Sequence, residues 1–257
     1  MLEVRNLVCG YRDKTVLQDV SFTAKNGDMV CILGPNGSGK STLIKTIIGL
    51  QDSYEGEILI DGEDIKDWSW NKRAKAISYI PQSFSSTFQY KAIDIVLMGR
   101  TSYLGFSSSP SKEDEEIAEE SMKMLKIIEL KDKIYSQLSG GERQLVKIAQ
   151  ALTQQSKIII MDEPTNNLDF GNQVTMLNHL RKCTDLGITI IMATHFPEQA
   201  LLYGTKALLV KDKTVIEVDK PDENLTEEDF QSLYDVEIKI IKLNLGDKTM
   251  KVCLPLF

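Results

Sequence analysis

The chain has few of the residues that build disulfide frameworks, metal centres or membrane anchors. It contains four cysteines and two histidines in 257 residues. The cysteines, at positions 9, 31, 183 and 253, lack metal-ligand spacing and are expected to be reduced thiols. No apolar run approaches the roughly 18 residues that cross a bilayer. The segment from Met1 to Arg5 carries an acid and lacks the apolar stretch of a signal peptide. These absences predict a cytoplasmic protein.

The chain has no excess of positive charge, because 37 acidic residues outnumber 30 lysines and arginines. The formal net charge is −7 and the isoelectric point is near 5.1. A general nucleic-acid surface needs a basic stripe, so no nucleic-acid partner is expected. Hydrophobic residues make up 42% of the chain, which is enough for a sizeable core. With one phosphate-loop pattern and no internal repeat, residues 1–257 are expected to form a single domain.

A glycine-rich segment near the N-terminus carries the first chemical signal. Residues 34–41, Gly-Pro-Asn-Gly-Ser-Gly-Lys-Ser, fit the pattern G-x-x-x-x-G-K-[ST]. The apolar run 29–33 before it predicts a buried strand, and the periodic run 42–49 after it predicts a helix closed by a glycine. In this context backbone N–H groups surround phosphates, Lys40 neutralises phosphate oxygens and Ser41 ligates Mg²⁺. The alternative, a glycine-rich turn without a ligand, is disfavoured by the strand, spacing, lysine and serine together. The expected phosphate and nucleotide contacts are Gly34, Pro35, Asn36, Gly37, Ser38, Gly39, Lys40, Ser41 and Thr42.

A second signal is the segment Ser139-Gly140-Gly141-Glu142. Each glycine costs roughly 1 kcal/mol in a helix relative to alanine, yet residues 144–152 downstream have helical spacing. One interpretation is a capping box between Ser139 and Glu142, which leaves the two glycines unexplained. The other is a helix N-terminus left bare so that a phosphate can approach its free N–H groups. On that view a bulky residue at Gly141 would favour the helix but block the phosphate.

Polar side chains follow several apolar runs that read as buried parallel strands. The runs are 157–161, 188–194 and 76–80, and the side chains that follow them are Asp162 and Glu163, His195, and Gln82. Ligands of open α/β sheets bind at the carboxyl ends of strands, so these groups and Lys40 are expected to share one crevice. They supply what Mg²⁺-assisted phosphoryl transfer to water requires.

The roles of these groups differ by position. Glu163 is the candidate general base or water-orienting residue. His195 would hydrogen-bond the γ-phosphate, although a lone histidine is more often an ordinary core or surface residue. His179 has no comparable context and is expected at the surface. The catalytic set is therefore Glu163, His195, Gln82 and Lys40.

Three motifs follow one another along the chain in the order typical of one protein family. They are the phosphate loop, the segment Leu-Ser-Gly-Gly-Glu-Arg-Gln at 138–144 and the block Asp-Glu-Pro-Thr at 162–165. Over nearly its whole length the chain resembles the ATP-binding subunit of an ABC transporter. The resemblance implies an α/β ATPase with a P-loop NTPase core and a mostly parallel sheet. It also implies an N-terminal antiparallel β subdomain, an inserted helical subdomain at about 83–152 and a short C-terminal extension at about 222–257. Its cofactors would be ATP and Mg²⁺, with Asp162 holding the metal through water and with Ser41 and Gln82 as nearer contacts.

The resemblance also implies a head-to-tail homodimer. Ser139, Gly140 and Gly141 of one subunit would close over the γ-phosphate bound by the partner's Lys40, and Asp169 would reach across the same interface. The loop Asn166-Asn167-Leu168-Asp169 departs from the Ser-Ala-Leu-Asp common among transporters. Tyr11 lies in a predicted turn at 9–13 between two alternating strands. An aromatic there is ordinarily a packing residue, and the resemblance implies that it stacks on adenine.

The region after Gln82 is expected to meet a membrane permease. Exposed aromatics near it, Phe84, Phe88 and Tyr90, are candidate contacts, with core packing as the alternative. Ser111 is expected to cap a helix, and four apolar residues are expected to share its face: Ile117, Met124, Leu125 and Ile128.

The segments 96–100 and 168–173 and the tail from Leu225 resemble importers of iron-siderophores, haem, cobalamin and related metal chelates or oxyanions. Such importers take cargo from a substrate-binding protein and place this subunit on the inner face of the membrane through the permease. The alternatives are a soluble ABC ATPase acting on ribosomes or DNA, and an exporter.

Overall fold

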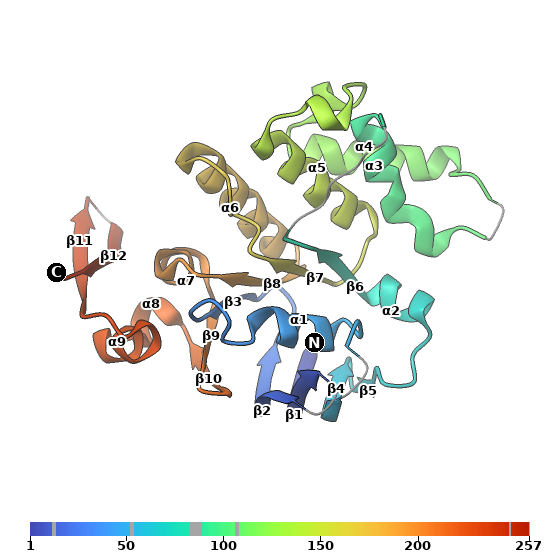
Figure 1. The fold of residues 1–257 in the computed structure, drawn as a ribbon. Helices are drawn as coiled ribbons and strands as arrows, with labels where there is room; N and C mark the ends of the chain where they lie inside the picture. Colours follow the sequence, from blue (N-terminus) through green and yellow to red (C-terminus); the bar gives the residue numbers. More distant parts are fainter. Residues whose placement is uncertain (12–13, 52–53, 83–88, 106–107, 247, 257) are drawn as a thin grey trace.

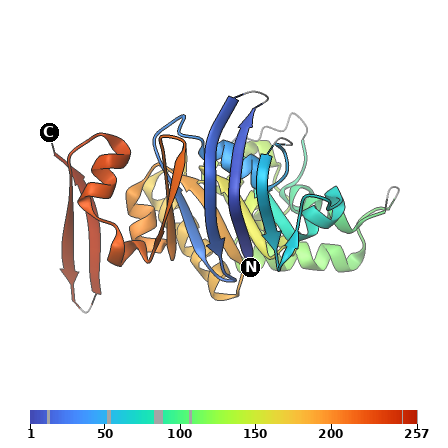
Figure 2. The same cartoon turned by 90° about the horizontal axis from the view of Figure 1, so that it is seen from below.

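The computed structural model describes residues 1–257 except 12–13, 52–53, 83–88, 106–107, 247 and 257. The described strands form a four-stranded sheet of order β2-β1-β4-β5, a six-stranded sheet of order β10-β9-β3-β8-β7-β6, and a hairpin of β11 and β12 (Figures 1 and 2). No helix of these described residues is long and apolar enough to cross a membrane.

The six-stranded sheet is the centre of the molecule. Its parallel strands are β3 (Met29–Leu33), β6 (Ile77–Ile80), β7 (Ile158–Asp162), β8 (Thr189–Thr194) and β9 (Lys206–Lys211), and β10 (Thr214–Asp219) runs antiparallel to β9. Every residue of β3, β7 and β8 is buried, because both faces of the sheet are covered. The predicted α/β fold with a mostly parallel sheet is therefore confirmed.

The antiparallel sheet covers one face together with helix α1 (Lys40–Ile47). Its strands are β1 (Leu2–Tyr11), β2 (Lys14–Ala24), β4 (Tyr54–Ile60) and the short β5 (Glu63–Asp64). Strand β1 buries Leu2, Val4, Leu7 and Cys9. The prediction of a turn at 9–13 is wrong for Tyr11, which ends β1 paired with Lys14, because ladder pairing extends the hairpin further than the apolar alternation does.

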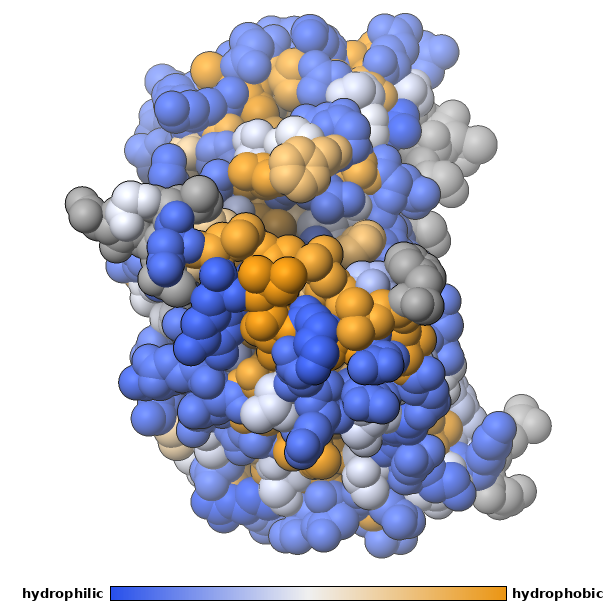
Figure 3. Space-filling view, turned by 90° about the vertical axis from the view of Figure 1, so that its left-hand side faces the viewer, coloured by the Kyte–Doolittle hydropathy of each residue, from blue (hydrophilic) through white to orange (hydrophobic). Residues whose placement is uncertain are grey.

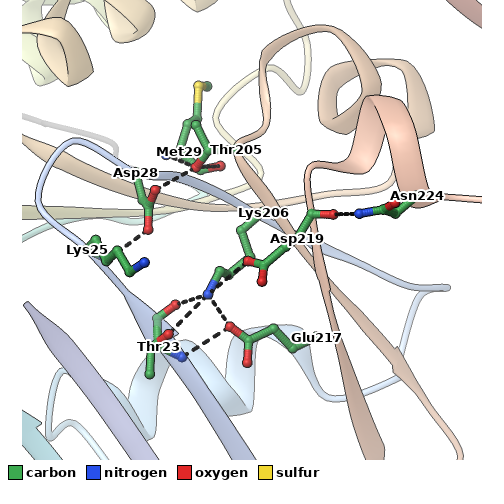
Figure 4. A network of polar contacts seen from close by, with 9 residues as sticks. All are labelled: Thr23, Lys25, Asp28, Met29, Thr205, Lys206, Glu217, Asp219 and Asn224. Carbon is green, nitrogen blue, oxygen red and sulfur yellow. Dashed lines mark hydrogen bonds and ion pairs between the residues drawn. The ribbon is translucent and has the colours of Figure 1, made fainter.

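A buried lysine joins this sheet to the edge of the central one (Figure 4). The Lys206 ammonium donates to the backbone oxygen of Thr23 at 2.6 Å, forms an ion pair with Glu217 and lies 3.4 Å from Asp219. Burial alone would lower the pKa of Lys206, but the two carboxylates outweigh it and raise the pKa. The charge is thus accommodated inside the protein by paired groups.

The opposite face of the sheet is covered by helices. Between β6 and β7 lie α3 (Ala92–Leu97), η1 (Met98–Tyr103), α4 (Lys112–Met124), η2 (Ile128–Leu130), η3 (Tyr135–Gln137) and α5 (Gly140–Thr153). After β7 and β8 come α6 (Phe170–Asp185) and α7 (Pro197–Tyr203). Helix α2 (Trp70–Ala76), which precedes β6, lies instead on the α1 side, next to Ile48 and Leu50. Helices α5, α6 and α7 contribute to the same hydrophobic core as β3, β7 and β8.

Two side-chain placements differ from expectation. Ser111 caps α4 as predicted, but Met124 is exposed, and the helix buries Ala118, Ser121 and Met122 instead. His179 is buried in α6 rather than exposed, and this burial lowers its pKa. In both helices the packed face is selected by tertiary contacts that a periodic pattern does not specify.

The segment 96–100 has a structural role. Arg100 and Asp114 form a buried ion pair at 2.7 Å, and Arg100 also donates to the Thr153 backbone oxygen. A Cβ at Gly99 would lie 2.3 Å from the Gln150 backbone oxygen, so only glycine allows η1 to approach α5 this closely. This segment fastens η1 to α4 and α5.

The chain after β10 forms α8 (Pro221–Asn224), α9 (Glu227–Tyr234), β11 (Ile238–Leu245) and β12 (Lys248–Pro255). Thr226 caps α9. The hairpin of β11 and β12 lies at one extremity of the molecule, next to α9 and far from α2 (Figures 1 and 2). Figure 3 looks at the molecule from the side of the hairpin and shows a hydrophobic area across its middle with a hydrophilic surround.

Candidate functional site

The phosphate loop connects β3 to α1 and folds around Lys40. The buried Lys40 ammonium donates to the backbone oxygens of Gly34 at 2.7 Å and Pro35 at 3.0 Å. Burial lowers the pKa of Lys40, and the carboxylates of Glu163 and Asp162 partly offset this. Gly39 has a φ of 112°, which side chains rarely adopt, and a Cβ there would lie 2.9 Å from Val16. Local backbone geometry and close packing thus both require this glycine.

Two adjoining cavities lie along the loop. The first, about 310 Å³, is lined by Tyr11, Lys14, Val16, Asn36, Gly37, Gly39, Lys40, Ser41, Thr42 and Glu163. The second, about 460 Å³, is lined by Lys14, Thr15, Val16, Pro35, Asn36, Gly37, Ser38, Lys211, Asp212, Lys213 and Asp235. Tyr11 is 45% exposed, and its hydroxyl accepts a hydrogen bond from Thr42 at 3.4 Å. The structure therefore places an aromatic ring in the lining of the cavity that Lys14 and Lys40 also line.

Asp162 ends β7 in a position suited to a cation. Burial raises the pKa of its carboxyl group, although a hydrogen bond from Ser41 opposes the shift. Its Oδ1 is buried and has no hydrogen-bond partner among the described residues, and the same holds for the Ser38 hydroxyl. No three His, Cys, Asp or Glu side chains of the described chain cluster as a metal site by themselves. This donor set fits Mg²⁺ held by Asp162, Ser41, water and phosphate oxygens.

Glu163 follows Asp162 with its backbone in the left-handed region, at a φ of 48°. Such a conformation is uncommon for a non-glycine residue and is found more often at functional sites. Its Oε2 accepts a hydrogen bond from Gln82 Nε2 at 2.7 Å and another from Asn166 Nδ2. Two of the predicted site residues are thus in direct contact.

His195 lies one strand away, directly after β8. Strands β7 and β8 pair Asp162 with Ala193, so His195 and Glu163 follow neighbouring strand ends. The His195 ring is half-buried and packs on Phe196, with centroids 4.1 Å apart. Behind it, the buried Gln199 accepts from Thr194 at 2.7 Å and donates to Thr165 at 3.0 Å. This network ties the residues after β7 to the end of β8.

Helix α5 begins at Gly140, and the capping box is present. Ser139 Oγ accepts from the Glu142 backbone N–H at 3.2 Å, and Glu142 accepts from the Ser139 backbone N–H at 2.8 Å. The two glycines differ in their surroundings. A Cβ at Gly141 would lie 2.6 Å from the side chain of Asn172, whereas a Cβ at Gly140 would meet nothing closer than the Asn167 backbone oxygen at 3.6 Å.

Asn172 was not anticipated as a site residue. Its side chain donates to Asp169 Oδ2 at 2.7 Å, and its backbone N–H donates to Asp169 Oδ1 at 2.8 Å. The only sequence signal is its place three residues after an N-cap aspartate. Through Asn172 the structure connects the Ser139–Gly141 segment with Asp169, but none of these residues lines the two phosphate-loop cavities.

Comparison with known proteins bears directly on this site. The family model described as ABC transporter matches residues 17–166, which hold the phosphate loop, the Ser-Gly-Gly segment and the carboxylates after β7. The chain belongs to the ABC transporter family. As predicted from its sequence, the cassette is an ATPase of the kind that serves membrane transport.

The cassette has full-length relatives. It is 38% identical over 251 residues to an ABC transporter ATP-binding protein of Haemophilus influenzae, covering 98% of this chain and 95% of the relative. It is 33% identical over 245 residues to the hemin import ATP-binding protein HmuV of Pseudomonas fluorescens, covering 93% of this chain and 94% of that protein.

Solved structures agree with these matches. A metal-chelate type ABC transporter in an inward-facing conformation has a chain with TM-score 0.89 and 30% identity, covering 100% of this chain and 97% of that one. An ATP-binding cassette in a dimeric post-hydrolysis state bound to ADP and phosphate matches with TM-score 0.73 and 29% identity, covering 86% of this chain and 99% of that chain.

Proposed function

We propose that this cassette hydrolyses ATP to energise a membrane importer and that it works as a head-to-tail homodimer. One observation carries the dimer: Ser139, Gly140 and Gly141 adjoin Asp169 through Asn172, away from the phosphate-loop cavities of the same chain. The N-terminus of α5 is suited to bind a phosphate, but it does not adjoin the phosphate-loop cavities of its own chain. A second copy would bring Ser139, Gly140 and Gly141 over the γ-phosphate bound to Lys40. A cassette of related structure is dimeric with ADP and phosphate bound.

In this proposal each described residue has a defined task. Tyr11 stacks on adenine, and residues 34–42 bind the phosphates. Mg²⁺, when bound, neutralises phosphate oxygens, and Ser41, Gln82 and Asp162 are the residues that would hold it. Lys40 exchanges its two backbone acceptors for phosphate oxygens, a stronger charge-assisted interaction.

Glu163 and His195 carry out the hydrolysis step in this proposal. Glu163 accepts a proton from the attacking water or orients that water, and Gln82 and Asn166 fix the carboxylate by hydrogen bonds. His195 donates a hydrogen bond to the γ-phosphate from the end of the neighbouring strand. Loss of that phosphate removes the contacts that favour the closed dimer, so hydrolysis separates the subunits.

A permease would dock near the approach to Gln82. An apolar hollow of about 170 Å³ is lined by Ile48, Leu50, Trp70, Arg73, Ala74, Ile77 and Tyr79. Leu50 and Trp70 are largely exposed, and Ile77 and Tyr79 belong to β6, the strand that precedes Gln82. Tyr90 is partly exposed and remains a candidate contact, whereas Phe84 and Phe88 lie outside the described residues. Docking there would place the protein at the cytoplasmic face of the membrane.

The domain assignment and the cargo are parts of the same proposal. Residues 1–257 would form one ABC ATPase domain with a helical subdomain at about 83–152 and a C-terminal extension at about 222–257. The cargo would be an iron-siderophore, haem, cobalamin or a related metal chelate or oxyanion, delivered by a substrate-binding protein. The relative named for hemin import and the metal-chelate type neighbour support this class.

Reconstitution with the permease tests the importer. Gln82→Ala removes the hydrogen bond to Glu163 and should leave ATP binding largely intact while lowering transport per ATP hydrolysed. The basal ATPase of the isolated subunit and transport by the complex are measured side by side. Normal transport per ATP in Gln82→Ala would refute the coupling role. A wild-type protein that co-purifies with ribosomes and never with membranes would favour the soluble ATPase instead.

A further inference from the structure

Two amide side chains share one oxygen of the Glu163 carboxylate. Gln82 Nε2 donates to Oε2 at 2.7 Å, and Asn166 Nδ2 donates to the same atom. The second oxygen, Oε1, accepts no hydrogen bond within the described part of the chain. A carboxylate held in this way has one oxygen fixed and the other available to accept a hydrogen bond from water. Glu163 lines the cavity beside the phosphate loop, whereas neither amide residue does.

The two donors lie in different surroundings. The Gln82 side chain is exposed and lies at the proposed approach of the permease. Asn166 is partly buried and belongs to the turn that follows the base, because its backbone N–H donates to the Glu163 backbone oxygen at 3.2 Å. A bound permease can therefore change the Gln82 contact, while the Asn166 contact stays with the base.

The turn that carries Asn166 is fixed by buried hydrogen bonds. Thr165 is 1% exposed, and its hydroxyl accepts a hydrogen bond from Gln199 of α7 at 3.0 Å. Gln173 of α6 donates to the Leu168 backbone oxygen at 3.0 Å. These contacts fix the turn on both sides of Asn166, so the position of its amide donor is fixed as well.

The contact depends on asparagine at position 166. This position begins the loop that departs from the Ser-Ala-Leu-Asp common among transporters. A serine hydroxyl is one bond closer to the backbone than an asparagine amide, so it would reach less far toward Glu163. Alanine has no donor at all. The residue at position 166 therefore decides whether the base has a donor besides Gln82.

We propose that Asn166 is a positioning residue that keeps Glu163 in place independently of Gln82. The inference rests on the proposed function, in which Glu163 orients the attacking water or accepts its proton. When a permease draws Gln82 away, Asn166 still holds Oε2 and leaves Oε1 free for the water. Hydrolysis by this cassette then depends less on Gln82 than it would with a serine at position 166.

A double-mutant cycle on steady-state ATP hydrolysis by the full-length protein tests this. Because both amides hold the same oxygen, loss of the second donor should cost more than loss of the first. Asn166→Ala should lower kcat about tenfold and change KM for ATP by less than about twofold. Gln82→Ala should lower kcat at least about fivefold more in the Asn166→Ala background than in wild type. Circular dichroism melting checks folding, and Asn166→Ser serves if the alanine variant is unfolded.

Asn166→Asp distinguishes hydrogen-bond donation from packing. Aspartate has the shape of asparagine but offers Glu163 an acceptor and a like charge instead of a donor. Asn166→Asp should therefore lower kcat at least as much as Asn166→Ala. Asn224→Asp is the matched control, because Asn224 at the end of α8 also donates one amide hydrogen bond, to the Asp219 backbone oxygen at 2.6 Å (Figure 4). Its kcat should equal that of wild type.

The outcomes separate this proposal from the proposed function. An additive cycle, or a wild-type kcat in Asn166→Asp, overturns the positioning role of Asn166. A lower kcat accompanied by a lower melting temperature and a raised KM also overturns it, because such a result reports a disturbed loop. Wild-type turnover in Glu163→Gln overturns the proposed base itself. An inactive Glu163→Gln together with an additive cycle keeps Glu163 as the base and removes only Asn166.

Discussion

The side chain of Asn172 lies against Gly141, where an added Cβ would come within 2.6 Å of it. The same side chain donates to Asp169 at 2.7 Å. Asn172 thereby connects the beginning of α5 with the beginning of α6, the two helix ends that the proposed dimer directs at a second subunit. Packing against Asn172 within the chain explains why residue 141 is a glycine. No such contact requires a glycine at position 140, where a Cβ would have room.

This difference predicts opposite stability effects at adjacent glycines. Gly141→Ala should destabilise the fold by about 1–3 kcal/mol through overpacking against Asn172. Gly140→Ala should stabilise α5 by up to about 1 kcal/mol. A larger side chain, as in Gly140→Arg, should fit the monomer yet abolish ATP-driven dimerisation. Urea unfolding and size-exclusion chromatography with ATP report the two properties. The sequence-based expectation that a bulky residue at Gly141 would favour the helix conflicts with the contact between Gly141 and Asn172. The helical spacing of apolar residues does not reveal that Asn172 of another helix packs there.

Glu163→Gln should separate binding from turnover. Glutamine keeps the size and the amide contacts of the side chain but cannot take a proton, so ATP affinity should persist while hydrolysis falls by a factor of about 100 or more. The variant should accumulate as a dimer with ATP. Chromatography and phosphate release are measured together, with Glu198→Gln on α7 as a control. Hydrolysis at the wild-type rate would remove Glu163 from the mechanism.

Asp162 should make the nucleotide-free protein less stable at neutral pH. Because burial raises its pKa, the ionised carboxylate is penalised in the folded state. That penalty grows as pH rises through the unfolded and then the folded pKa, and it is complete above both. Asp162→Asn should therefore raise the melting temperature at pH 7 without ligand and lose the further rise that Mg²⁺-ATP gives wild type. A lower melting temperature in the ligand-free variant would contradict this account.

The Arg100–Asp114 ion pair should make the free energy of unfolding fall at acidic pH. Hydrogen bonds from Ser111 and Arg100 lower the pKa of Asp114 to about 2. Its stabilising contribution is thus complete above the unfolded pKa near 4 and is lost as pH falls toward 2. Asp114→Asn should cost about 3 kcal/mol at pH 7, because Arg100 loses its buried partner. Denaturant unfolding from pH 7 to pH 3 should show the two proteins converging, and a constant gap would exclude the ion pair as the cause.

The sequence predicted those parts of the molecule that are set by local pattern. Strands β3, β7 and β8 are continuous apolar runs, and the glycine spacing of residues 34–41 requires one particular turn, so fold class and family followed directly. The side chains after β7 could be expected together because parallel strands end at one edge.

Features that depend on how helices pack could not be predicted. The burial of His179, the exposure of Met124 and the contact of Asn172 with Gly141 each depend on which faces of α4, α5 and α6 meet. The pairing of β11 and β12 has the same origin, since their alternation gives apolar residues on both faces and does not indicate which one packs on the core.

Mixing two inactive variants tests most directly whether one ATP site is built from two chains. Lys40→Ala has a defective phosphate loop and an intact Ser139–Gly141 segment. Gly140→Arg has an intact phosphate loop and a defective Ser139–Gly141 segment. Each variant alone should hydrolyse ATP at background rate. Mixed dimers should regain activity, because each contains one site with an intact phosphate loop and an intact partner segment. A mixture as inactive as its components, with mixed dimers shown to form by cross-linking, would contradict the head-to-tail site.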